Sequence, residues 1–193
     1  MHNGRLGRRN VVNVSEDMRN RVKDAVLKSG MWQAEYVNKQ SLKYYQEIRD
    51  ICKGNACRHY GASWACPPAV GTLNECRARV DQYDNFLLFS QKYALEDSFD
   101  IEGMQRGMLA FKDSVDVLDD MIKSMLPRRL ILSNESCVRC AKCTYPNMPC
   151  RFPERLYHSI EGYGFNVSEL ARAAGIMYNN GVNTVTFLGG LLF

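Results

Sequence analysis

The eight cysteines are the residues of this sequence with the clearest capacity for chemistry, and they fall into two groups of four. The second group begins as C-x2-C-x2-C at Cys137, Cys140 and Cys143, and Cys150 follows after six further residues. Thiolates at this spacing reach different irons on one face of a cubane, as in ferredoxins. A single zinc ion more often draws together two separated C-x2-C pairs, because its four ligands are tetrahedral. The spacing therefore favours a [4Fe–4S] cluster, with zinc as the alternative.

The first group is more widely spaced and consists of Cys52, Cys57, Cys66 and Cys76. Pro67 follows Cys66, and in ferredoxin sequences a proline usually follows the fourth ligand, where it fixes the backbone and removes a competing N–H donor. We therefore predict that this group holds a second cluster. All eight cysteines are predicted as metal and cofactor ligands, for one or two [4Fe–4S] clusters in total.

Two alternatives for the ligand sets remain open. Cys76 lies on the apolar face of a predicted helix, where a buried and inert cysteine is common. Without Cys76, the first cluster would have an open iron or a fourth ligand such as His59. In two-cluster ferredoxins the cysteine before proline binds the other cluster, so an exchange of Cys66 or Cys150 between the groups is the second alternative.

The elements that position the cysteines are predicted from periodicity and capping signals. Thr72 followed by Glu75 is a capping-box pattern, and apolar residues three and four apart indicate a long amphipathic helix that ends before Pro127. The patterns predict helices over residues 15–30, 44–51, 72–83, 101–125 and 166–175. They predict strands over 31–37, 86–89 and 184–188, and a continuation of the last strand to residue 193 is left open. Helices that alternate with strands favour an α/β (or α+β) fold, a small sheet with flanking helices and two cysteine-rich metal-binding loops.

Composition excludes several classes of protein. The chain has 193 residues, 46% of them hydrophobic and 24% charged, with a net charge of +4. It has no run of about 18 apolar residues that would span a membrane and no secretory signal pattern. We expect a cytoplasmic protein, in which clustered cysteines bind metal more often than they pair as disulfides.

The domain organisation is predicted to be simple. Residues 1–14 are interpreted as a flexible N-terminal tail, and residues 15–193 as a single iron–sulfur or metal-binding domain. The densest basic patch, formed by Arg5, Arg8 and Arg9, lies in this tail. Such a patch is more often a solvated terminus than a nucleic-acid surface, so nucleic-acid binding is not favoured.

Two cysteine-containing blocks carry a resemblance to a known family. They are Cys57-Arg-His-Tyr-Gly-Ala-Ser-Trp-Ala-Cys66-Pro-Pro68 and the segment from Cys137 to Glu154, and they are followed by 159–167 and 183–188. Over residues 30–193 the chain resembles a family of cysteine-rich predicted metal-binding proteins, a domain of unknown function from anaerobic bacteria and archaea. The resemblance implies metal binding through the cysteines and the company of corrinoid-dependent methyl-transfer systems and other anaerobic redox enzymes. Residues 132–135, where glycines are often found in this family, depart from the pattern.

Three functions fit these observations. The first is electron transfer to a redox partner protein, or reductive activation of a partner enzyme, in anaerobic metabolism. The second is an iron–sulfur oxidoreductase that acts on a small substrate at an open iron beside Tyr60, Trp64 or Tyr163. The third is a module whose metal only stabilises the fold. The first is favoured because the sequence has no complete dinucleotide fingerprint, P-loop or G-x-S-x-G motif.

The two cysteine groups are also expected to lie close together. The intervening helix, strand and helix can return the chain to the end of the sheet from which it started. A ligand exchange between the groups would require this proximity, and so would electron passage between two clusters.

Overall fold

The computed structural model describes residues 14–193, so the predicted N-terminal tail lies almost wholly outside the described residues. The described part contains five α-helices, which are α1 (Glu16–Lys28), α2 (Gln46–Lys53), α3 (Leu73–Val80), α4 (Ile101–Ile122) and α5 (Val167–Ala174). Its five strands are β1 (Gln33–Tyr36), β2 (Phe86–Ala94), β3 (Leu130–Ser133), β4 (His158–Ser159) and β5 (Thr184–Leu192). Short 3-10 helices are η1 (Lys39–Ser41), η2 (Pro153–Arg155) and η3 (Glu161–Tyr163). The α/β prediction is confirmed.

The five strands form one mixed sheet in the order β1-β2-β5-β3-β4. The pairs β1–β2, β2–β5 and β5–β3 are antiparallel, and β3–β4 is parallel. Strand β2 runs five residues beyond the predicted apolar segment, because Ser90 to Ala94 continue the ladder with β5 as far as Thr184. Strands β3 and β4, which are four and two residues long, were not predicted from the sequence.

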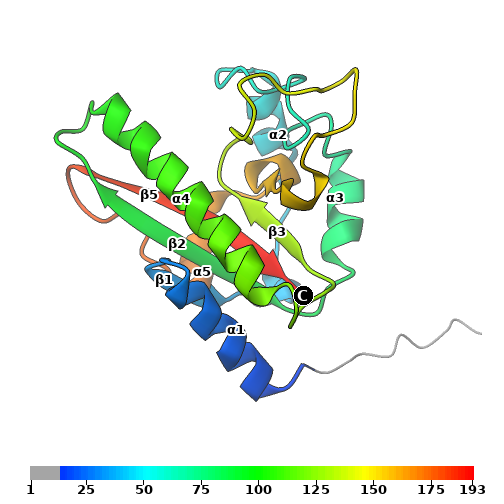
Figure 1. The fold of residues 1–193 in the computed structure, drawn as a ribbon, viewed down its shortest axis with the longest axis vertical. Helices are drawn as coiled ribbons and strands as arrows, with labels where there is room; N and C mark the ends of the chain where they lie inside the picture. Colours follow the sequence, from blue (N-terminus) through cyan, green and yellow to red (C-terminus); the bar gives the residue numbers. More distant parts are fainter. Residues whose placement is uncertain (1–13) are drawn as a thin grey trace, which may run out of the picture.

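Helices cover both faces of the sheet (Figure 1). Residues of α1 and α4 pack with Leu87 and Phe89 on one face, whereas residues of α3, η3 and α5 pack with Phe86 and Leu88 on the other. Successive side chains of a strand point to opposite faces, so both cores draw on the same short run of β2. Burial on both faces explains why that run is continuously apolar.

The predicted helix starts are confirmed by their caps. The side chains of Ser15, Thr72 and Asn166 accept hydrogen bonds from the backbone N–H groups of the residues three positions later. Thr72 and Glu75 form the full capping box, which fixes the first turn of α3. Helix α4 ends at Ile122, three residues earlier than predicted.

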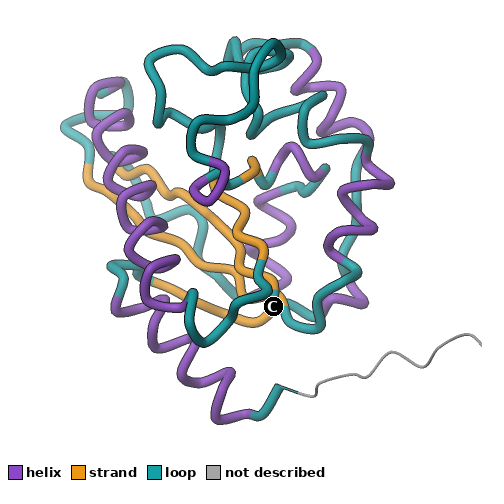
Figure 2. Tube along the Cα trace, turned by 45° about the vertical axis from the view of Figure 1, so that its right-hand side comes forward, coloured by secondary structure: helices purple, strands orange, loops and turns teal. Residues whose placement is uncertain are grey.

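Two long loops carry most of the cysteines. The first runs from residue 54 to 72, between α2 and α3, and the second from 134 to 152, between β3 and η2. They lie side by side at one end of the sheet in both views (Figures 1 and 2). Strand β4 joins the first loop through a 2.8 Å hydrogen bond from Ser159 N to the carbonyl oxygen of Ala65. Among residues 14–193, no helix combines the length and the apolar character that crossing a membrane requires.

Candidate metal centre

The four cysteines of the second group line one small cavity. Cys137, Cys140, Cys143 and Cys150 all contribute to its wall, together with Trp64 from the other loop. All four thiols are free and partly exposed. A cluster with four cysteine ligands requires four thiols around one shared space.

Hydrogen bonds within the second loop shape this cavity. Thr144 Oγ1 donates to the carbonyl oxygen of Pro149 at 2.8 Å, and Arg151 Nη1 donates to the carbonyl oxygen of Lys142 at 3.0 Å. The backbone N–H of Phe152 lies 3.4 Å from the sulfur of Cys150. An N–H donor of this kind stabilises negative charge on sulfur, which is one way a protein tunes a bound cluster.

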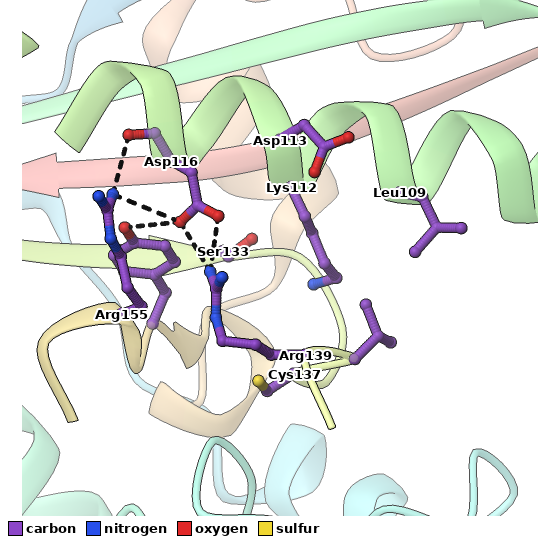
Figure 3. A pocket seen from close by; sticks show the side chains of 10 residues that line it. Leu109, Lys112, Asp113, Asp116, Ser133, Cys137, Arg139 and Arg155 are labelled. Atoms are coloured by element: carbon purple, nitrogen blue, oxygen red, sulfur yellow. Dashed lines mark hydrogen bonds and ion pairs between the residues drawn. The ribbon is translucent and has the colours of Figure 1, made fainter. Parts of the chain in front are cut away.

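An ion-pair network fastens the second loop to helix α4 (Figure 3). Arg139, between two of the cysteines, places Nη2 2.7 Å from both carboxylate oxygens of Asp116. Arg155, just beyond the loop, donates to the carboxylate of Asp120 at 2.8 Å. Tyr157 adds a hydrogen bond of 3.0 Å from its hydroxyl to Asp116. The loop is therefore held between its first two cysteines and again just after its last cysteine.

Three of the four cysteines of the first group line a second cavity, of about 590 Å³. Cys52 lies in the last turn of α2, Cys57 is exposed in the loop, and Cys66 is buried. Burial raises the pKa of the Cys66 thiol to about 11, and the hydroxyls of Ser136 and Ser159 beside it oppose this rise. Burial also raises the pKa of Cys52, with smaller contributions from neighbouring acidic groups.

Cys76 lies apart from these three cysteines. It is fully buried in the core between the sheet, α3 and α5. Its sulfur is 3.5 Å from the carbonyl oxygen of Val70 and 3.9 Å from Nη1 of Arg49. The structure thus brings seven of the eight cysteines to the two cavities and leaves Cys76 in the apolar core.

Two carboxyl groups, Glu135 and Glu161, line the first-group cavity and were not foreseen from the sequence. Burial raises the pKa of Glu161 to about 7; nearby Glu135 adds to the rise and Lys112 opposes it. These residues are 26 positions apart and far from the first group in sequence, so only the fold reveals their proximity. His59, the alternative ligand considered from the sequence, also lines this cavity.

Two buried polar atoms at the first-group cavity have no hydrogen-bond partner among the described residues. They are the hydroxyl oxygen of Ser136 and Oε2 of Glu161. Buried polar groups are nearly always paired, so such atoms indicate a partner that the protein alone does not supply. A bound group with negatively charged sulfur beside Ser136 fits this requirement, because the hydroxyl can donate to it.

The aromatic residues singled out in the sequence have different surroundings. Trp64 lines the second-group cavity, and its ring lies 4.8 Å from that of Tyr145 at an angle of 88°. Tyr163 is fully buried, and its hydroxyl accepts a 2.6 Å hydrogen bond from Arg79 and lies 2.9 Å from Nδ1 of His158.

Lys112 of α4 lines a further cavity together with Cys137. Its ammonium donates a 2.8 Å hydrogen bond to the carbonyl oxygen of Asn134 and projects toward Cys137 (Figure 3). Burial lowers its pKa, while nearby acidic groups oppose this; they are Glu135, Cys137, Glu161 and Cys66. This partly buried cation therefore lies within electrostatic range of one cysteine of each group.

No three His, Cys, Asp or Glu side chains within residues 14–193 converge closely enough to hold a single metal ion in this structure. A family model described as "Predicted metal-binding protein (DUF2284)" matches residues 35–193, which include both cysteine groups. This match confirms the resemblance noted in the sequence. No curated protein and no solved structure matches the chain.

Proposed function

This chain belongs to the family of predicted metal-binding proteins, and on that premise we propose that it is an electron-transfer protein with two [4Fe–4S] clusters, one on each cysteine group. The observation that carries the proposal is the shared cavity of Cys137, Cys140, Cys143 and Cys150. When bound, such clusters supply one-electron oxidation and reduction. The chain supplies ligands, burial and charge.

The second group matches the needs of a fully ligated cluster. Its four thiols provide one ligand for each iron. Arg139 and Arg151 line the same cavity and offset the negative charge of four thiolates. The ion pairs between Arg139 and Asp116 hold the loop against α4, so the ligands are positioned by a rigid element rather than by the loop alone.

The first group provides three thiols, and the Ser136 hydroxyl beside them has no other hydrogen-bond partner among residues 14–193. Cys52, Cys57 and Cys66 face one cavity, and Ser136 lies beside the buried thiol of Cys66. Ser136 immediately precedes Cys137, so one short segment contributes to both centres. This closeness supports a relay in which an electron enters at one group and leaves at the other.

A relay needs a redox partner protein, and a corrinoid-dependent methyl-transfer system is the candidate that the family resemblance suggests. The free cysteines favour a reducing setting such as the cytoplasm of an anaerobe. A zinc-stabilised module is the competing proposal, because thiols also bind zinc well.

Metal analysis of protein purified without oxygen tests the proposal. Two [4Fe–4S] clusters correspond to about eight irons and about eight sulfides per chain, and the reduced protein should give an EPR signal. Replacement of Cys140 by serine should remove about half of the iron, because this residue belongs to the second group only. Stoichiometric zinc without sulfide, in protein made with ample iron, would contradict the proposal.

A further inference from the structure

The position of Cys76 separates it from the first-group cavity. Its sulfur lies 4.0 Å from the carbonyl oxygen of Gly162, whereas the neighbouring Glu161 presents its side chain to the cavity. The 3-10 helix η3 therefore lies between Cys76 and the cavity and contacts each of them. Cys76 is also fixed by the capping box of Thr72 and Glu75, so its approach to the cavity would require α3 to unwind.

The remaining wall of the cavity has the character of a small-molecule site. The cavity of about 590 Å³ would hold the centre on Cys52, Cys57 and Cys66 as well as a ligand, and its whole volume lies within the range of roughly 300–1,000 Å³ that is typical of small-molecule sites. Apolar side chains form much of the wall, and they are Ile48, Ile51, Phe165 and Val167. Against them stands one buried acceptor, Oε2 of Glu161, that no described residue satisfies.

We infer that the centre on Cys52, Cys57 and Cys66 has only three cysteine ligands and opens its fourth position to this cavity, where it binds a small neutral molecule that has a hydrocarbon part and one O–H or N–H group. This inference rests on the proposed function, since it assigns a ligand to one of the two clusters. It adds a substrate-binding role to a protein otherwise described as an electron carrier.

The charges around the cavity define the class of ligand. Glu135 and Glu161 both line it, and a cluster with thiolate ligands is itself anionic, so a further anion is disfavoured. Two partly buried cations lie near it, and both already donate to backbone carbonyl oxygens: Lys112 to Asn134, and Arg49 to Gly162 and Gly71. A neutral molecule with a single donor satisfies Glu161 Oε2, while its hydrocarbon part lies against the apolar wall.

Controlled oxidation of the anaerobic protein tests the number of cysteine ligands. In a [4Fe–4S] cluster with three cysteine ligands, one iron has no cysteine. When ferricyanide oxidises the cluster, this iron is readily lost as Fe²⁺, and the [3Fe–4S] centre that is left has its own EPR signal. We expect about one such centre per chain, because the second group has four cysteines. Addition of Fe²⁺ with dithiothreitol should remove the signal again. In this oxidation test Cys76→Ser and His59→Ala should convert to the same extent as wild type. Cys57→Ser, at an exposed position, should lose the convertible centre and keep the other.

Imidazole, neutral above pH 8 and equipped with one N–H, is the probe for the cavity. It should shift the EPR spectrum of the reduced first centre, and Glu161→Gln should weaken its apparent affinity about tenfold. A full complement of iron and sulfide without any conversion would overturn this inference alone. If only the Cys76→Ser or the His59→Ala variant converted, the replaced residue would be the fourth ligand of the wild-type cluster. This result would also overturn the inference and leave the proposed function standing. Protein without iron and sulfide would overturn the proposed function as well.

Discussion

The indole Nε1 of Trp64 donates a 3.1 Å hydrogen bond to the carbonyl oxygen of Met148, and this bond joins the two cysteine loops. Trp64 lies two residues before Cys66, and Met148 lies two residues before Cys150. The bond therefore brings the two loops together two residues away from one ligand candidate of each group. The expectation that the two groups lie close together is confirmed by this contact.

Replacement of Trp64 by alanine should weaken the magnetic coupling between the two centres. In wild-type protein with both clusters reduced, the neighbouring spins should broaden the EPR signal. Loss of the indole removes the hydrogen bond and the edge contact with Tyr145, so the loops should separate and the broadening should decrease. Trp32→Ala is the matched control, since that ring packs against Lys92 and not against a cysteine loop. Equal spectra for wild type and Trp64→Ala would refute this prediction.

The anchoring of the second loop gives a prediction about cluster retention. Asp116→Asn should weaken the bonds to Arg139 and Tyr157 and cost about 1.5 to 3 kcal/mol of stability, the usual range for hydrogen bonds to charged groups. The second centre should then lose iron to a chelator faster than in wild type, while the first centre keeps its rate. Asp113→Asn, an exposed change one turn away on α4, is the control. Similar rates for the two variants would show that the ion pairs do not hold the ligands.

Much of the fold was predictable because its signals are local. The caps at Ser15, Thr72 and Asn166 depend on residues three positions apart, and the long helix shows an unbroken apolar period. Strands β3 and β4 escaped prediction because pairing with distant partners, rather than a long apolar run, makes them strands. Residues 132–135 lack the glycines that the family often has there. The structure shows what this means locally, since Glu135 adopts a positive φ of 50° that glycine would adopt more easily.

The candidate site was predictable only in part. Cysteine spacing indicated the second group directly, and the four thiols do share one cavity. The sequence left open whether Cys76 is a ligand or a core residue, and its helical position places it in the core. Glu161, Ser136 and Lys112 could not be foreseen, because their relation to the cysteines arises from the packing of η3, the second loop and α4.

Lys112 should raise the reduction potentials of both centres. Its ammonium lies within electrostatic range of Cys66 and Cys137, and a nearby positive charge stabilises the more negative, reduced state. Lys112→Gln removes the charge but keeps a donor for Asn134, so both midpoint potentials should fall. A shift of about 60 mV would correspond to about 1.4 kcal/mol for a one-electron couple. Lys123→Gln, near the end of α4 and paired with Asp120, should change neither potential. A fall in one potential only would mean that Lys112 serves a single centre.

His158 should make the folded state sensitive to acid. Arg79 donates to the hydroxyl of Tyr163, and this hydroxyl is then free to donate to Nδ1 of His158, which must be unprotonated to accept. Burial, with a contribution from Arg79, lowers the pKa of His158 from 6.5 to about 4. The unfolded chain therefore binds a proton between these two values that the folded chain does not, so stability falls as the pH is lowered through 6.5 toward 4.

Urea unfolding of anaerobic protein at a series of pH values measures this effect. Between pH 7 and pH 5 the contribution of His158 should decrease the free energy of unfolding by about 2 kcal/mol. Glu161 acts in the opposite sense over this range, because burial raises its pKa to about 7. The quantity to compare is therefore the difference between wild type and His158→Gln, which cannot take up the proton. This difference should shift in favour of the variant by about 2 kcal/mol as the pH falls from 7 to 5. A difference that stays constant with pH would show that His158 binds its proton equally well in the folded and unfolded chains.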